Sequence, residues 1–80
     1  MLVKIKNLSK RTIEDVTATL GSDDWLLGAE EAEDPDNDLQ NVFINNSCVI
    51  IKILDETLQI DLGGVKADIS AFDFSEVVIV

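Results

Sequence analysis

Histidine and tyrosine are both absent from this 80-residue sequence, and cysteine and proline each occur once. The lack of histidine removes the most common general base and most pairs that activate a nucleophile. Cys48 has no histidine to activate it, and its place in an apolar run indicates a buried, unreactive thiol. The four glycines form no phosphate-binding loop. We therefore predict that the chain is not an enzyme and that it needs no cofactor.

The features of exported and membrane-bound chains are also missing. No run approaches the roughly 20 apolar residues that cross a bilayer. Lys4 and Lys6 interrupt the first apolar residues, which excludes a typical signal peptide. A single cysteine allows no intrachain disulfide, whereas small secreted domains usually carry several. We expect a cytoplasmic protein that does not bind membranes.

The segment 12–51 contains no basic residue, so positive and negative charges are separated along the sequence. The net charge is −10, from 16 acidic and 6 basic side chains. Four of the basic residues lie within residues 1–11, whereas ten acids lie within 12–51. A concentrated negative field repels nucleic acid and attracts basic surfaces. We therefore expect a basic protein partner and no direct binding of nucleic acid.

The clearest local pattern in the sequence is a β-hairpin. Residues 58–62 and 65–69 alternate apolar and polar side chains on the two sides of Gly63-Gly64. Two glycines supply the positive φ angles of a two-residue hairpin turn. The register that follows from this turn places Asp61 opposite Lys66, an opposite-charge pair. We predict an antiparallel hairpin with this register.

Three further segments favour strands. Residues 47–54 are apolar on both faces, which predicts a central strand. Asn45-Asn46 predicts a turn that would pair residues 41–44 with 48–51. The segment 76–80 predicts a strand that pairs inside the sheet or in a homodimer, because an open apolar strand invites aggregation.

Two segments are ambiguous. Residues 13–20 fit a strand or a helix, and we favour the strand because threonine and β-branched residues lower helix propensity. The segment 22–40 predicts an acidic crossover without β character, as a loop or as a short helix near 22–34. The fold class is therefore all-β, or α+β if that helix forms. We expect one domain, 1–80, with a small antiparallel sheet of roughly five to six strands, as a compact sandwich or open barrel.

The acids of the crossover surround Trp25, which belongs either to the core or to an interface anchor. Solubility alone is the simpler explanation of the acidity, and it stays open. The functional hypothesis is a module that blocks a basic surface of a partner, such as a nucleic-acid-binding surface. Inhibitors, antitoxins, toxin-immunity proteins and phage-encoded nucleic-acid mimics act in this way. The candidate partner-binding residues are Asp23, Asp24, Trp25, Glu30, Glu31, Glu33, Asp34, Asp36 and Asp38.

Two other hypotheses remain. Asp34, Asp36 and Asp38 have the spacing of the first calcium ligands of an EF-hand loop, which suggests a calcium-assisted accessory domain. The rest of that motif is missing, because Leu39 replaces its glycine and Asn45 replaces its final glutamate. The third hypothesis is a structural or assembly subunit that forms a homodimer through its C-terminal strand.

Overall fold

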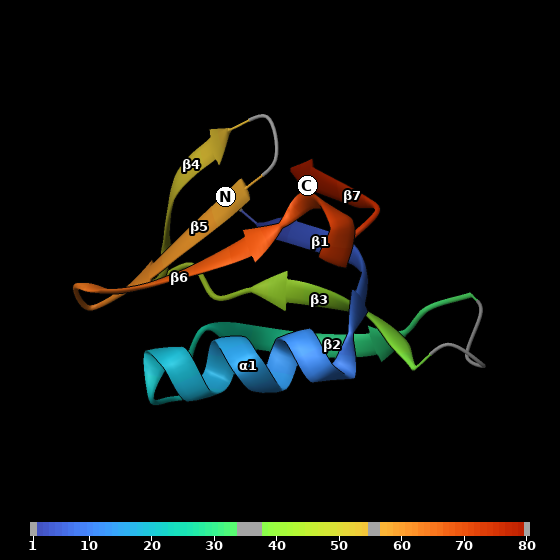
Figure 1. The fold of residues 1–80 in the computed structure, drawn as a ribbon, viewed down its shortest axis with the longest axis horizontal. Helices are drawn as coiled ribbons and strands as arrows, with labels where there is room; N and C mark the ends of the chain where they lie inside the picture. Colours follow the sequence, from blue (N-terminus) through green and yellow to red (C-terminus); the bar gives the residue numbers. More distant parts are fainter. Residues whose placement is uncertain (1, 34–37, 55–56, 80) are drawn as a thin grey trace.

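The computed structural model describes residues 2–33, 38–54 and 57–79, which form two antiparallel sheets and one α-helix (Figure 1). The first sheet has the strand order β2-β3-β1-β7, and the second has the order β4-β5-β6. The elements are β1 (Val3–Ser9), α1 (Lys10–Leu20), β2 (Leu26–Glu31), β3 (Leu39–Ile44), β4 (Val49–Leu54), β5 (Thr57–Leu62), β6 (Val65–Ser70), the 3-10 helix η2 (Ala71–Asp73) and β7 (Glu76–Ile79). The expectation of a small, mostly β protein built from antiparallel sheets is confirmed. The described residues form seven strands, and the additional one is β2.

The predicted hairpin is confirmed as β5 and β6, in the expected register. Leu58 pairs with Ile69 and Ile60 pairs with Ala67, and all four side chains are buried. The turn glycines have φ angles of 62° and 94°. Asp61 lies opposite Lys66 as predicted, but its carboxylate accepts a hydrogen bond from the backbone N–H of Gly64 at 2.7 Å. The carboxylate of Asp61 therefore stabilises the turn.

The preference for a strand over residues 13–20 is wrong, because these residues belong to helix α1. The helix begins after Ser9, whose hydroxyl accepts a hydrogen bond from the Thr12 N–H at 3.1 Å. It ends at Gly21, which has a φ of 72° and donates its N–H to the Thr17 carbonyl at 2.9 Å. Both ends are thus capped in the way that helices prefer.

Tertiary packing outweighs the low helix propensity of this segment. Val16 and Leu20 are buried on one face of α1, with Ile13 packed against the same core. These positions are three, four and seven apart, which places them on one side of a helix. The Thr19 hydroxyl donates to the Asp15 carbonyl at 2.9 Å, so this threonine is compatible with the helical backbone.

The segment 22–33 also differs from expectation. It contains a turn followed by strand β2, so neither the short helix near 22–34 nor the crossover without β character is correct for these residues. Strand β2 pairs with β3 from Leu26 to Glu31, with a β-bulge between Leu26 and Gly28. No side chain of β2 is buried. Strand β2 is therefore held by its backbone pairing with β3 and by the residues at its two ends. Its own side-chain pattern does not predict a strand.

The pairing of β3 and β4 is a further correction. Residues 41–44 pair with β1 and β2 instead of returning along 48–51. The Asn45-Asn46 turn is present, with the Cys48 N–H donating to the Asn45 carbonyl at 2.9 Å, but it carries the chain from the first sheet to the second. Strand β4 is consequently an edge strand of the second sheet, not a central strand. Sequence separation therefore did not decide the partners of β3, which pairs with β1 and β2 and not with the strand that follows it.

The first and last strands lie side by side. β7 pairs with β1 from Val77 opposite Ile5 to Ile79 opposite Val3, so the expectation that the terminal strand pairs inside the sheet is confirmed. Val3 and Ile5 are buried and alternate with the half-buried Lys4, as the sequence pattern indicates. Within the three ranges that the structure describes, no helix has the length and apolar character required to cross a membrane.

One buried cluster joins α1 to both sheets, and Trp25 is its largest fully buried side chain. The Trp25 side chain has 0% exposure, and its indole N–H donates to the Thr17 hydroxyl of α1 at 3.0 Å. Its backbone carbonyl accepts from the Asn45 N–H at 2.9 Å. Trp25 therefore connects the helix, the start of β2 and the turn after β3.

We predict that Trp25→Ala lowers the free energy of unfolding by about 3–5 kcal/mol, because it opens a cavity in the core. Trp25→Phe retains most of the apolar volume but loses the indole hydrogen bond and is expected to cost less. Urea denaturation followed by circular dichroism measures both. The control is Phe72→Ala, which should change stability by less than about 0.5 kcal/mol because Phe72 is 90% exposed. Equal effects of the tryptophan and phenylalanine replacements by alanine would contradict this assignment of the core.

Candidate functional site

The described acids of the segment 21–33 lie along one margin of the first sheet. Asp23 and Asp24 lie in the turn between α1 and β2, Glu30 and Glu31 end β2, and Glu33 follows it. All five side chains are exposed. Because β2 is the outermost strand of this sheet (Figure 1), these residues lie in two groups at the two ends of its edge. We call strand β2 with these five acids the acidic edge.

In the folded structure, basic residues of the N-terminal segment lie close to acidic residues that are distant in the sequence. The Lys4 ammonium lies 3.0 Å from the Glu30 carboxylate, and Lys10 lies 3.7 Å from Asp38. Lys4 lies on β1, and its side chain reaches across β3 to Glu30 of β2. Lys10 begins α1 and lies beside Asp38, which directly precedes β3. Among the described residues, no ion pair involves Asp23, Asp24, Glu31 or Glu33. The negative field of the acidic edge therefore comes mainly from these four carboxylates.

Trp25 is not part of an exposed surface, which corrects its place among the candidate binding residues. Its complete burial and its hydrogen bond to Thr17 make it a core residue. The apolar side chain that faces solvent at the acidic edge is Leu27, with 60% exposure. Leu27 lies at the β-bulge between Leu26 and Gly28, and it has no partner residue in β3. Nothing in the sequence distinguishes Leu27 from its neighbour, because the bulge arises from the pairing with β3.

The calcium hypothesis concerns Asp34, Asp36 and Asp38. Asp34 and Asp36 lie outside the described residues. Asp38 is exposed, has a φ of 52° and approaches Lys10. Within residues 2–33, 38–54 and 57–79, no three potential ligands lie close enough together to hold a metal ion.

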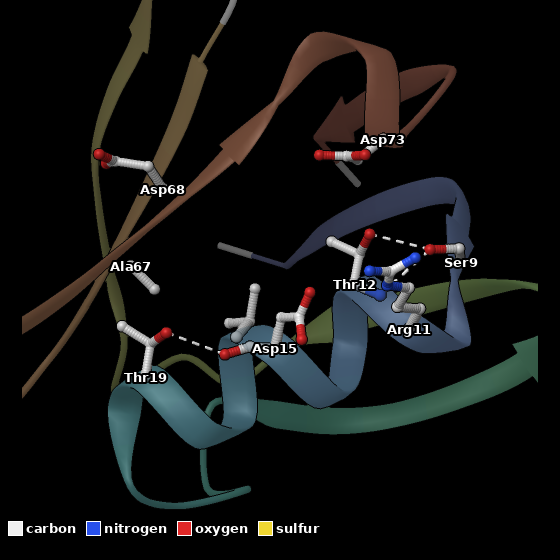
Figure 2. Close-up of a pocket in the computed structure, with 9 residues that line it drawn as sticks. Ser9, Arg11, Thr12, Asp15, Thr19, Ala67, Asp68 and Asp73 are labelled. Atoms are coloured by element: carbon white, nitrogen blue, oxygen red, sulfur yellow. Dashed lines mark hydrogen bonds between the residues drawn. The ribbon is translucent and has the colours of Figure 1, made fainter.

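A polar groove of about 380 Å³ lies between α1 and β6 (Figure 2). Asp15, Asp68 and Asp73 line it together with Arg11, and their side chains come from the helix, from β6 and from η2. Thr12, which also lines the groove, accepts a hydrogen bond from the Ser9 hydroxyl at 2.8 Å. The hydroxyl groups of Ser9, Thr12 and Thr19 in this groove therefore take part in local hydrogen bonds of α1 and its N-terminal cap.

A second groove, of about 640 Å³, lies over the lysines of β1 and the acidic end of β2. Lys4 and Lys6 line it with Glu30 and Glu76, and each lysine is paired with one of these acids. The Lys4 ammonium also lies 5.3 Å from the centre of the Phe43 ring, within the range of a cation–π contact. Glu31 and Glu33 also line this groove, so its charges are only partly compensated and the acidic edge continues into it.

Cys48 is buried at the start of the second sheet. Burial raises the pKa of the Cys48 thiol, and the negative charges of Asp24 and Asp61 act in the same direction, against a hydrogen bond with Ser47 that lowers the pKa. A raised pKa leaves less thiolate at neutral pH, and the thiolate is the nucleophile. The arrangement therefore makes Cys48 a weak nucleophile.

We predict that the native protein reacts with an aromatic disulfide reagent at least about tenfold more slowly than the urea-unfolded chain. The native rate should rise with pH beyond the ordinary titration range of a free thiol, because the pKa is raised. Absorbance of the released thiolate measures both rates, and Cys48→Ser supplies the blank. Equal rates in the folded and unfolded states would contradict the buried position.

Comparison of the chain with protein-family models, with curated proteins and with solved structures finds no match.

Proposed function

We propose that this chain is a non-enzymatic binding module whose acidic edge docks on a basic surface of a protein partner. By occupying that surface, for example one that binds nucleic acid, the module acts as an inhibitor, in the manner of an antitoxin, an immunity protein or a phage-encoded nucleic-acid mimic. The single observation that supports this proposal most is the two groups of exposed carboxylates at the two ends of β2. Four of them, those of Asp23, Asp24, Glu31 and Glu33, form no ion pair with a described basic residue.

The electrostatics favour this class of partner. With a net charge of −10 on 80 residues, the molecule attracts cationic surfaces over a distance of about 10 Å at 0.1 M salt. Such attraction raises the association rate more than it raises the final affinity. A partner with a positive patch would thus be selected before close contacts form.

The attachment of the edge to the core also favours docking. The two ends of β2 are fixed, by the buried Trp25 on one side and by the buried Ala32 on the other. The Ala32 N–H donates to the Leu39 carbonyl at 3.2 Å, which continues the pairing with β3 beyond the end of β2. The backbone of a strand that is fixed at both ends loses little conformational freedom on binding.

We predict that a basic protein from an extract of the producing cells is retained on the immobilised module at low salt and elutes as ionic strength rises. The double variant Glu31→Gln/Glu33→Gln should lose this protein, because it removes two charges of the acidic edge. The matched control is Asp68→Asn/Asp73→Asn, which removes the same charge from the groove between α1 and β6 and should retain the protein. Mass spectrometry identifies the retained protein. Absence of a retained basic protein, or equal loss in both variants, would contradict the proposal.

Assembly through the C-terminal strand is a second candidate, and one observation favours it. β7 is the opposite edge strand of the first sheet, and Ile79 is 59% exposed there. An open apolar edge can pair with the same edge of a second copy. Deleting residues 77–80 would also remove Val77, which packs against the core, so a surface substitution is the better test.

For this second candidate we predict that the wild type elutes as a dimer and Ile79→Lys as a folded monomer, because a lysine on an edge strand opposes pairing. Size-exclusion chromatography with light scattering measures the mass, and circular dichroism confirms that the variant is folded. Lys66→Ala, a change on the exposed hairpin, is the control. A monomeric wild type at about 100 µM would reject this candidate.

A further inference from the structure

Strand β2 has one edge that no other described element pairs with. It is the last strand in the order β2-β3-β1-β7, and α1 packs chiefly against β6 and β1. We propose that an extended, lysine- or arginine-rich segment of the partner adds to this edge as a fifth strand of the first sheet. This inference rests on the proposed function, and it specifies how the basic partner binds.

The alternation of the antiparallel ladder identifies the backbone groups that remain available. The Ala32 N–H bonds to Leu39, so residues of β2 at even positions direct their backbone groups toward β3. Ala29 and Glu31, at odd positions in the regular part of the ladder, consequently direct their N–H and C=O groups to the free edge. Both residues are exposed. An added strand would satisfy these groups with main-chain hydrogen bonds.

The free edge is also accessible from both faces of the sheet. Four of the six side chains of β2 are exposed, and α1 makes its main contacts with β6 and β1. Leu27, 60% exposed at the bulge, offers an apolar contact beside the edge. The regular part of the ladder, from Gly28 to Glu31, is long enough for a short added strand.

The negative charge of the acidic edge determines which segments can pair with the free edge of β2. Negative side chains on an edge strand repel an identical edge and so oppose pairing of two copies through β2. The same side chains favour cationic residues directly opposite or diagonal to them in an added strand. Glu31 lies in the strand and Glu33 lies two residues beyond it, so a segment with alternating lysines would place cations beside both. The acidic side chains thereby oppose pairing with a second copy of β2 and favour pairing with a cationic segment.

The test uses the whole chain and a synthetic peptide of about eight residues that alternates lysine with valine and threonine. A second peptide has the same sequence and charge, but its internal amides are N-methylated and cannot donate hydrogen bonds. Isotope-labelled protein is titrated with each peptide by NMR. We expect the N-methylated peptide to bind at least about tenfold more weakly, because it lacks main-chain donors. We also expect the unmodified peptide to slow hydrogen exchange at Ala29 and Glu31.

A protein variant gives a second measurement. Ala29→Pro removes an outward N–H and should weaken binding of the unmodified peptide by at least about tenfold, since proline is tolerated on an edge strand when its nitrogen faces solvent. Ala29→Val keeps the N–H and is the matched control, with binding unchanged within about twofold.

Equal binding of the two peptides would overturn strand addition while leaving docking by charge intact. Absence of measurable binding by the unmodified peptide would also overturn it. Retention of the basic protein by Glu31→Gln/Glu33→Gln would instead overturn the proposed function itself. The failure of the binding mode and the failure of the function are therefore distinguishable.

Discussion

The burial of the Trp25 indole is the constraint on which most of this structure depends. A large aromatic side chain removed from water contributes more to a small core than any other residue here, and its N–H requires a partner in the interior. Thr17 supplies that partner from α1, which fixes the helix against the start of β2. The Trp25 carbonyl then accepts from Asn45, which fixes the end of β3. The position of β2 follows largely from these contacts, because none of its own side chains is fully buried and only Leu26 packs against the core.

The position of β1 determines how much of the negative charge remains uncompensated. Lysines that lie at the N-terminal end of the sequence become central in the first sheet, where they approach acids from both sides. Lys4 reaches Glu30 of β2, and Lys6 reaches Glu76 of β7. The Lys6–Glu76 pair is exposed, and pairs of that kind contribute little to stability. The main consequence of the two pairs is electrostatic, because they compensate the charges of Glu30 and Glu76 and leave those of Glu31 and Glu33 without a basic partner among the described residues.

The two edge strands of the first sheet differ in the features that oppose pairing with a strand of another molecule. β2 carries acids and a bulge at Leu27, which are two devices that oppose pairing with an identical strand. β7 has a single acid, Glu76, and is short. A strand edge with negative side chains repels another negative strand, but it can still pair with a positively charged segment. Protection against self-association and selection of a basic partner are thus two effects of the same side chains.

The sequence by itself determined the structures whose signals are local. The hairpin about Gly63-Gly64 needed only alternation and a two-glycine turn, and the strand at 76–79 needed only its apolar pattern. The exposure of the acids was also evident from their chemistry, since an unpaired carboxylate stays in water. Tertiary structure alone decided that 10–20 is a helix, that 26–31 is a strand and that Trp25 is buried, because each depends on contacts with residues distant in the sequence. Local propensity cannot encode such contacts, since they form only when the core assembles.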